Sequence, residues 1–306
     1  MAKIWGQAYF KDSLVPVEKA QLSVASSAVL YGLSVYTVFP ICVTPNGVAA
    51  FRLGDHFRRL VQSARIIAID GFEKEWTFER FEKAVKELAK ANKILEDVFV
   101  RATVHVDALV AGTRSRGMST ALSIFIYEAK AIVPQDGARL KTSVWRRIPD
   151  YAIPSRAKVN GAYVNSVLAK QDAIDSGYDD CIFLDVAGHV CELSAANIFL
   201  VRDDVLITPG LESDILEGIN RRTVLELARD MKIPAIERVV DMTELYVADE
   251  IFACGTSAFI APVKEVDGRI IGGGKMGPIT AKIRTLHHDT MHGRNEAYQH
   301  LLTSVV

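Results

Sequence analysis

The chain has 306 residues, 49% of them hydrophobic and 24% charged, and its 36 basic and 37 acidic side chains leave a formal net charge of −1. This length accommodates one large or two medium domains, and the composition is typical of a globular enzyme. The balanced charge argues against a nucleic-acid partner, because non-specific binding to nucleic acid depends on clustered Lys and Arg. The four cysteines are scattered without a CxxC pair, which favours buried thiols in a reducing compartment over disulfides or a metal site.

The N-terminal part of the chain predicts a mixture of strands and helices. Runs rich in Val, Tyr, Phe and Ile predict strands at residues 3–10, 35–52, about 97–106 and 120–128, with a hairpin turn at 45–47. Helical spacing of apolar residues predicts two helices, one from Asp55 that ends near Gly71 and one from Thr77. Because strands and helices do not alternate regularly, we expect a small α+β domain over residues 1–130.

The stretch AIVPQDG at residues 131–137 lacks periodicity and contains Pro and Gly, so it is the predicted interdomain linker. Residues 138–306 are then expected to form a larger C-terminal domain. The predicted strands of this domain lie at 142–146, in an antiparallel meander from 180 to about 209, and at 250–254 and 258–266. The predicted helices lie at about 164–176, at 219–231 and after Pro278. Nothing at the N-terminus resembles a signal peptide, and we expect a cytoplasmic protein without membrane contact.

Residues 272–277, GGGKMG, satisfy the GxGxxG pattern of dinucleotide-binding folds. The pattern follows a predicted hairpin close to the C-terminus, where no room remains for the second parallel strand of a βαβ unit. A glycine-rich turn before the last helix is therefore the better interpretation.

Three segments together resemble the class IV aminotransferases, the pyridoxal-phosphate enzymes of fold type IV. They are SRAKVNGAYVNSVLAKQDAIDSG at 155–177, HVCELSAANIFLV at 189–201 and CGTSAFIAPV at 254–263. The resemblance runs from about residue 3 to about 290. It implies pyridoxal 5'-phosphate as cofactor, a small N-terminal domain, a larger C-terminal pseudo-barrel domain that binds the cofactor, and a homodimer or higher homo-oligomer, because the family builds its site at a subunit interface.

Lys158 is the predicted catalytic residue. It lies two residues before an Asn160-Gly161 turn, where a rigid and partly desolvated setting can make an amine nucleophilic. Spacing alone would leave it as one ordinary lysine, but it matches the family position that binds the cofactor aldehyde. Glu192 would otherwise be a solvent-facing strand residue, and it matches the carboxylate that keeps the pyridine nitrogen protonated.

The resemblance supplies the other predicted cofactor ligands. Tyr163 matches a hydroxyl near the ring oxygen, and Asn197 matches a residue that supports Glu192. Before it, Ala196 stands where the family often has an acid. Arg59 matches the arginine that clamps the phosphate.

Backbone amides are expected to complete the phosphate site. The start of a helix offers them at Ile219 and Asn220, and a glycine-preceded turn offers them at Thr256 and Ser257.

The substrate residues are predicted from mixed signals. Tyr36 and the following Thr37-Val38 resemble the D-amino-acid and (R)-amine branches, whereas Arg101 resembles the branched-chain arginine that accepts a substrate carboxylate, with Phe99 in place of a common tyrosine. We expect Arg101 and Tyr31 to bind a distal carboxylate, with amides near Thr256 and Ser257 on the α-carboxylate. The alternative is that Arg101 faces solvent.

The prediction is a transaminase that moves an amino group between an apolar, branched-chain-like amino acid and a 2-oxo acid such as 2-oxoglutarate or pyruvate. An (R)-amine or D-amino-acid transaminase is the first alternative, and an aminodeoxychorismate lyase is a more distant one. A catalytically inactive dimeric scaffold is the alternative outside enzymes. No metal is expected.

Overall fold

The computed structural model describes residues 2–306, and Met1 lies outside the described part. The chain forms two compact units. One comprises the chain up to Lys130 together with residues 157–161 and 290–306, and the other comprises residues 131–156 and 162–289. The sequence prediction assigned residues 157–161 and 290–306 to the C-terminal domain, whereas their contacts group them with the N-terminal unit.

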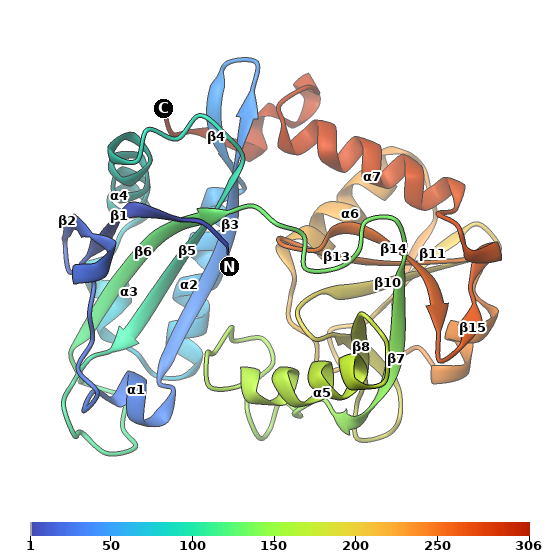
Figure 1. Cartoon of the computed structure of the whole chain (residues 1–306), viewed down its shortest axis with the longest axis horizontal. Coiled ribbons are helices and arrows are strands. Elements are labelled where there is room, and N and C mark those ends of the chain that lie inside the picture. Colours follow the sequence, from blue (N-terminus) through green and yellow to red (C-terminus); the bar gives the residue numbers. More distant parts are fainter. Residues whose placement is uncertain (1) are drawn as a thin grey trace. The chain divides into compact units, whose positions relative to one another are not determined.

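The first unit is built on a seven-stranded antiparallel sheet (Figure 1). Its strands are β1 (Ile4–Phe10), β2 (Ser13–Pro16), β3 (Ser34–Thr44), β4 (Gly47–Phe51), β5 (Val98–Val106), β6 (Thr120–Glu128) and β16 (Leu302–Ser304). Their order across the sheet is β16-β4-β3-β5-β6-β1-β2. The predicted strands and the hairpin turn at 45–47 are confirmed, while the C-terminal edge strand β16 was not predicted.

Helices cover one face of this sheet. They are α2 (Leu53–Ile66), α3 (Gly71–Glu75) and α4 (Phe78–Ala91), and short turns α1 (Ser27–Tyr31), η1 (Val17–Lys19) and η4 (Glu296–Leu301) lie in the connections. An aromatic cluster joins the layers, because the Phe81 ring of α4 lies 6.2 Å from Phe39 of β3 and 5.1 Å from Phe57 of α2. The two predicted helices are thus α2 and α4, and side chains that alternate with Phe39 along β3 lie on the opposite face of the sheet.

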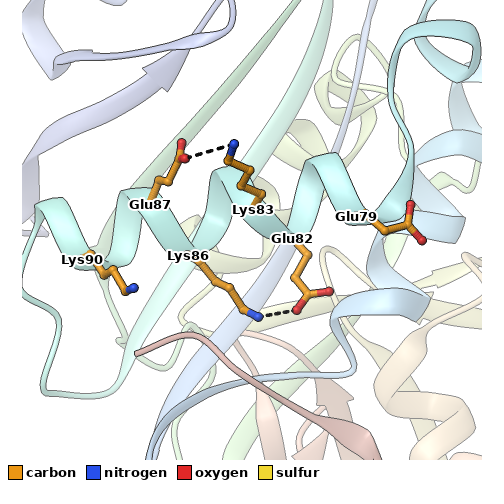
Figure 2. A pocket seen from close by; sticks show the side chains of 6 residues that line it. All are labelled: Glu79, Glu82, Lys83, Lys86, Glu87 and Lys90. Carbon is orange, nitrogen blue, oxygen red and sulfur yellow. Dashed lines mark ion pairs between the residues drawn. The ribbon is translucent and has the colours of Figure 1, made fainter.

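The outer face of α4 carries a pocket lined by charged side chains of that helix alone (Figure 2). Lys86 pairs with Glu82 at 2.6 Å and Lys83 with Glu87 at 3.9 Å, both at the i, i+4 spacing of a solvated helix face. Opposite charges already neutralise one another there, so this pocket is not a candidate functional site.

The second unit contains a closed barrel (Figure 1). Its strands are β7 (Ala138–Arg146), β8 (Asp180–Leu184), β9 (Val190–Leu193), β10 (Asn197–Arg202), β11 (Val205–Pro209), β12 (Ala235–Arg238), β13 (Glu250–Gly255), β14 (Phe259–Val266) and β15 (Arg269–Ile270). The order is β12-β11-β10-β13-β14-β7-β8-β9, and β9 also pairs with β10 through Glu192 and Asn197. That pair closes the ring of strands, so the predicted pseudo-barrel is confirmed.

The helices of the second unit are α5 (Tyr163–Asp175), α6 (Ile219–Asp230) and α7 (Pro278–Met291), with 3-10 turns η2 (Met242–Val247) and η3 (Gly272–Gly274). The GxGxxG pattern forms η3, which follows the β14–β15 hairpin and precedes α7, as the turn interpretation predicted. Across residues 2–306, no helix combines the length and the hydrophobicity needed to cross a bilayer.

The apolar residues that predicted α5 lie on its outer face. Val164 and Val167 are 65% and 64% exposed, whereas the buried residues of the helix are Ser166, Ala169 and Ala173. The spacing predicted the helix correctly, but small residues make its contact with the unit and the larger apolar side chains remain uncovered within this chain.

Candidate active site

Glu192 is the carboxylate of the predicted site, and several donors hold it in place. It is 5% exposed on β9, where Arg147 Nη2 lies 2.8 Å from its Oε1 and Asn197 Nδ2 donates to its Oε2 at 2.9 Å. The Leu216 amide donates to both oxygens at 3.3 Å. A buried carboxylate needs this number of donors to remain charged. Glu192 is therefore a fixed negative charge inside the unit, not the solvent-facing glutamate of the alternative interpretation.

Asn197 connects Glu192 to the start of α6. Its Nδ2 also donates to the Leu216 carbonyl at 3.1 Å, and its Oδ1 would lie 1.9 Å from a Cβ placed on Gly218. Gly218 is the N-cap residue of α6, so only a residue without a side chain fits there. The first residues of the helix, Ile219 and Asn220, are thereby set beside Asn197 with the free amides that an anion requires.

The turn after β13 lies next to the same point of the barrel. Asn197 pairs with Cys254, and a Cβ on Gly255 would lie 3.4 Å from the Ala195 carbonyl. The turn is anchored because the Ser257 carbonyl accepts from the Ile132 amide at 2.9 Å. Thr256 and Ser257 therefore follow β13, the strand that pairs with β10 at Asn197. They are the predicted second set of backbone donors for the phosphate or the substrate.

The cysteines beside this site are not nucleophiles. Burial raises the pKa of the Cys254 thiol to about 12 and also raises the pKa of Cys191, where the charge of Glu192 adds to the effect. Both thiols are neutral at physiological pH, so they act as packing groups.

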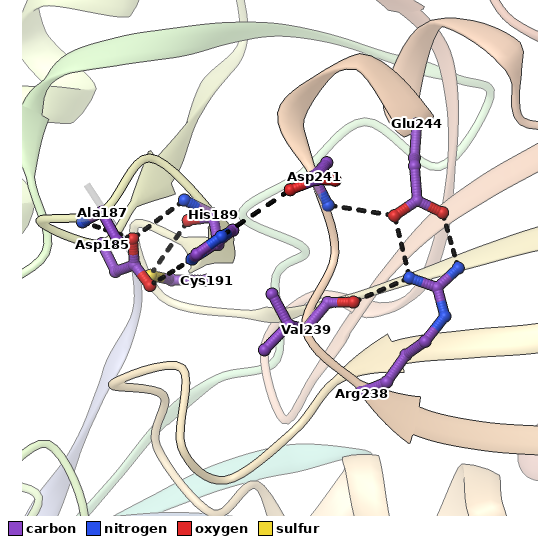
Figure 3. Close-up of polar contacts among 8 residues, drawn as sticks. All are labelled: Asp185, Ala187, His189, Cys191, Arg238, Val239, Asp241 and Glu244. Carbon is purple, nitrogen blue, oxygen red and sulfur yellow. Dashed lines mark hydrogen bonds and ion pairs between the residues drawn. The ribbon is translucent and has the colours of Figure 1, made fainter.

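A polar network holds the turn that leads into β9 (Figure 3). Asp185 accepts from the amides of Ala187 and His189 at 2.8 Å each, and its second oxygen lies 3.2 Å from His189 Nδ1. His189 Nε2 lies 3.7 Å from Asp241, which forms a capping box with Glu244 at the start of η2. These contacts fix the entry to β9 three residues before Glu192.

Lys158 lies in residues 157–161, the short segment that groups with the first unit. The Tyr36 amide donates to the Lys158 carbonyl at 3.0 Å, and the Asn160 amide donates to the Ser34 carbonyl at 2.9 Å. The segment thus pairs with the part of β3 that lies beyond the β4 pairing, which covers residues 41–44 of β3. The Lys158 amide donates to Ser63 Oγ of α2 at 3.1 Å, so both sheet and helix hold the backbone of the lysine.

The Tyr36 ring contacts two basic side chains. Arg101 Cζ is 3.7 Å and Lys158 Nζ is 4.9 Å from its centroid. The Arg101 guanidinium also donates to Asn160 Oδ1. Arg101 is half-buried in these contacts rather than fully solvated.

Arg59 lies on α2 one turn before Ser63. It is 9% exposed, and its Nη2 lies 3.5 Å from Thr37 Oγ1, which is 2.8 Å from His56 Nδ1. The neighbouring Arg58 is exposed and pairs with Asp55, which makes it the solvated charge of the two. Arg59, Lys158, Tyr36 and Arg101 are accordingly grouped around β3.

The remaining predicted residues differ in their surroundings. Phe99 is buried on β5 with its ring 5.7 Å from Tyr127, and Tyr31 is 45% exposed at the end of α1. Tyr163 is the first residue of α5 and is half-buried. The predicted site residues thus fall into two sets, one in each unit.

Several contributors were not identified from the sequence, namely Ser63, Arg147, the Asn160 side chain and Leu216. Arg147 left a weak signal, because it directly follows the predicted strand at 142–146, where a half-buried arginine needs an anion. The Leu216 amide left none, since any residue type can supply a backbone donor.

The comparisons with known proteins agree with this arrangement. Residues 34–266 match the family model described as amino-transferase class IV. The chain belongs to the class IV aminotransferases. The family resemblance drawn from the three sequence segments is therefore confirmed, together with the assignment as an aminotransferase.

Full-length relatives of this class IV aminotransferase are similar in sequence and structure. A "probable branched-chain-amino-acid aminotransferase" of Synechocystis is 34% identical over 98% of this chain and 97% of its own length. The structure of a branched-chain aminotransferase from Thermoproteus uzoniensis with norvaline superposes with a TM-score of 0.93 at 35% identity, covering 99% of this chain and all of that one. The PLP form of the enzyme from Thermobaculum terrenum gives 0.92 at 32% identity, covering 99% of each chain. The predicted fold type IV architecture is thereby confirmed.

Proposed function

We propose that this enzyme is a pyridoxal-phosphate-dependent transaminase that moves an amino group between an apolar, branched-chain-like amino acid and a 2-oxo acid such as 2-oxoglutarate or pyruvate. The observation that carries the cofactor assignment is the buried Glu192 carboxylate, which Arg147, Asn197 and the Leu216 amide hold as an anion. Such a group suits a protonated pyridine nitrogen. The relatives named above support the substrate class, since one of them is described with norvaline, an apolar amino acid.

The residues present fit this cofactor. Glu192 would face the ring nitrogen with Asn197 beside it, and Tyr163 would lie at the ring oxygen. Phosphate oxygens would be bound by Arg59 and by the amides of four residues, Ile219, Asn220, Thr256 and Ser257. Gly218 supports this assignment, because the absence of a Cβ lets Asn197 pack directly against the first turn of α6. When bound, pyridoxal phosphate supplies an aldehyde for the amino group and an electron sink for the charge that develops at Cα.

Lys158 has two tasks in this proposal. Its amine would hold the cofactor aldehyde, and the free amine would move the proton of the substrate Cα. The backbone contacts with Tyr36 and Ser63 keep the lysine in position for both tasks. The Lys158 amine and the Arg101 guanidinium both contact the Tyr36 ring, which supports the position of the lysine side chain.

The substrate specificity is assigned to the face of β3 and β5 opposite the helices. Tyr36 and Phe99, both buried, would lie behind the substrate side chain on this face. Arg101, with Tyr31, would receive the distal carboxylate of the dicarboxylic partner, and amides at Thr256 and Ser257 would receive the α-carboxylate. A single pocket would then accept both kinds of side chain, because Arg101 can pair with Asn160 when no carboxylate is present.

Borohydride reduction of the holoenzyme tests the cofactor site. We expect mass spectrometry to find one phosphopyridoxyl group per chain on the peptide that contains Lys158, and none in Lys158→Ala. Modification of another lysine, or a protein that takes up no cofactor, would contradict the proposal. The second outcome would favour the inactive scaffold.

Substrate assays separate the remaining alternatives. L-leucine with 2-oxoglutarate, D-alanine and (R)-1-phenylethylamine are compared side by side, and we expect the first to react fastest. The Tyr36-Thr37-Val38 pattern is the observation that favours an (R)-amine or D-amino-acid transaminase instead. Release of pyruvate without any amino acceptor would identify an aminodeoxychorismate lyase.

Arg101→Ala tests the dual pocket. We expect it to raise the KM for glutamate and 2-oxoglutarate at least tenfold with little change for leucine. Unchanged Michaelis constants for the dicarboxylates would refute the role of Arg101.

We infer a homodimer from α5. Its outer face exposes Val164, Val167, Leu168 and Ile174, and an apolar surface of this kind is typical of a subunit contact. A reducing, cytoplasmic location accords with four buried cysteines that are all free thiols.

A further inference from the structure

Three metal-ligating side chains meet in the first unit, away from the candidate active-site residues. They are Cys42 near the end of β3, Asp97 immediately before β5, and His292 immediately after α7. One ligand atom from each lies within 4.8 Å of the other two. The sequence alone does not reveal this cluster, because its three members are separated by 55 and 195 positions.

The backbone places Cys42 and Asp97 together. β3 and β5 are antiparallel neighbours in which Ile41 pairs with Val98, so the next residues outward along the two strands are Cys42 and Asp97. The Val43 amide donates to Asp97 Oδ1 at 2.8 Å and orients the carboxylate. A hydrogen bond of this kind is typical of the support behind a metal-binding carboxylate.

His292 reaches the same point from the C-terminal segment. Its Nε2 lies 2.9 Å from Asp97 Oδ2, and its side chain is only 10% exposed. The following Gly293 has a positive φ of 64°, and a Cβ there would lie 3.1 Å from Leu302 and 3.2 Å from Thr44. Glycine thus allows the tight turn that directs the imidazole toward β3 and β5.

We propose that Cys42, Asp97 and His292 bind one zinc ion, with water as the fourth ligand. Thiolate, imidazole and carboxylate are the three side-chain groups that bind zinc in proteins, at about 2.0–2.3 Å in a tetrahedron. Ligand atoms around such an ion are about 3.4 Å apart, so the cluster needs side-chain shifts of about an ångström or less. On binding, the Cys42 thiol loses its proton to solvent as the sulfur–zinc bond forms.

The site would act as a clamp on the C-terminal segment. Residues 302–304 add β16 to the edge strand β4, and the Leu301 carbonyl accepts from the Arg52 amide at 2.7 Å just before α2. A metal at His292 would fix the start of this segment to the middle of the sheet. Without zinc, the His292–Asp97 pair contributes to that connection.

Metal content of the holoenzyme tests the proposal. The protein is treated with a chelator, dialysed against micromolar free zinc and measured by mass spectrometry of the metal. We expect about one zinc per chain, at least a tenfold loss of affinity in Cys42→Ala and His292→Gln, and a zinc-dependent rise in the unfolding temperature of the wild type that these two variants lack. His189→Gln is the matched control, because His189 also lies between two carboxylates, Asp185 and Asp241, but without a thiol (Figure 3).

Cadmium gives a second readout that does not depend on the cofactor or on the folding of every variant. We expect the wild-type enzyme to show an ultraviolet cadmium–thiolate band that Cys42→Ala lacks. Equal zinc binding by the wild type and Cys42→Ala, or no thiolate band in the wild type, would overturn the proposal and leave an ion pair between His292 and Asp97.

Discussion

Glu192 and Asn197 close the barrel and also lie at the centre of the proposed cofactor site. They are the pair that joins β9 to β10, and the Asn197 side chain donates to Glu192 at 2.9 Å. The carboxylate is therefore held by the same strand pairing that completes the fold. A substitution of Glu192 or Asn197 that impairs cofactor binding is therefore predicted to change the stability of the second unit as well.

Asn197→Asp tests this relationship with an isosteric change. The new carboxylate would lie against Glu192 and could not donate a hydrogen bond, so one of the two would become protonated. We expect cofactor affinity to fall at least tenfold and unfolding to require about 2–4 kcal/mol less free energy. Cofactor titration and chemical denaturation measure the two effects. Asn295→Asp is the control, because Asn295 caps η4 through its side-chain oxygen, a role that aspartate also fills; similar losses in both variants would contradict the prediction.

Arg147→Met removes the charged partner of Glu192. The remaining buried carboxylate would lose its compensating charge, which favours its neutral form, and a neutral Glu192 could not keep the pyridine nitrogen protonated. We expect kcat to fall at least tenfold and Arg147→Lys to recover part of it. Single-turnover measurements with leucine follow the chemical step. Arg58→Met, which alters an exposed arginine, should leave kcat unchanged; an active Arg147→Met enzyme would show that Asn197 and Leu216 suffice.

Gly218→Ala tests the proposed phosphate-binding turn at the start of α6. A Cβ would lie 1.9 Å from Asn197 Oδ1, so either the asparagine or the helix start must shift. We expect the dissociation constant of pyridoxal phosphate to rise about 10-fold to 100-fold with a smaller effect on secondary structure. Gly6→Ala is the matched control, because its Cβ would have no atom within 4 Å. Equal cofactor affinity in the two variants would mean that Asn197 accommodates the added methyl group.

His105 gives the first unit a defined dependence on pH. Burial, with the nearby charge of Arg101, lowers its pKa from 6.5 to about 4. The folded chain therefore binds this proton less readily than the unfolded chain, so the stabilisation is complete above about pH 6.5 and is lost as the pH falls toward 4. Between pH 7 and pH 5 we expect a loss of about 2 kcal/mol in the free energy of unfolding.

Denaturant titrations of His105→Gln at the two pH values measure this contribution. The variant should lose about 2 kcal/mol less than the wild type, since glutamine does not titrate. His288→Gln serves as the control, because the His288 side chain is 54% exposed and should not change the pH dependence. Parallel pH profiles for the wild type and His105→Gln would refute the assignment.

Val167→Glu on α5 tests the homodimer. Two copies of a charge in an apolar contact would be costly, so we expect dissociation into monomers at micromolar concentration. Light scattering coupled to gel filtration measures the mass. Leu95→Glu, at another exposed apolar position that is 78% exposed, should leave the assembly intact. An unchanged dimer in Val167→Glu would place the subunit contact elsewhere on the surface.

Local patterns in the sequence were sufficient to identify the family and most of the elements. Apolar spacing predicted α2, α4 and α6, because helical periodicity reflects which side of one element is buried. The three motif segments led to Lys158 and Glu192 as candidates, because each motif is a continuous stretch of chain.

Contacts between distant residues were decided only by folding. The grouping of residues 157–161 with the first unit, the ion pair of Arg147 with Glu192 and the meeting of Cys42 with His292 each join segments whose spacing carries no period. Even α5 illustrates the limit, because its apolar residues predicted a helix but not which face is buried. Periodicity records that a side chain prefers to leave water, whereas its partner is chosen by the packing of the whole chain.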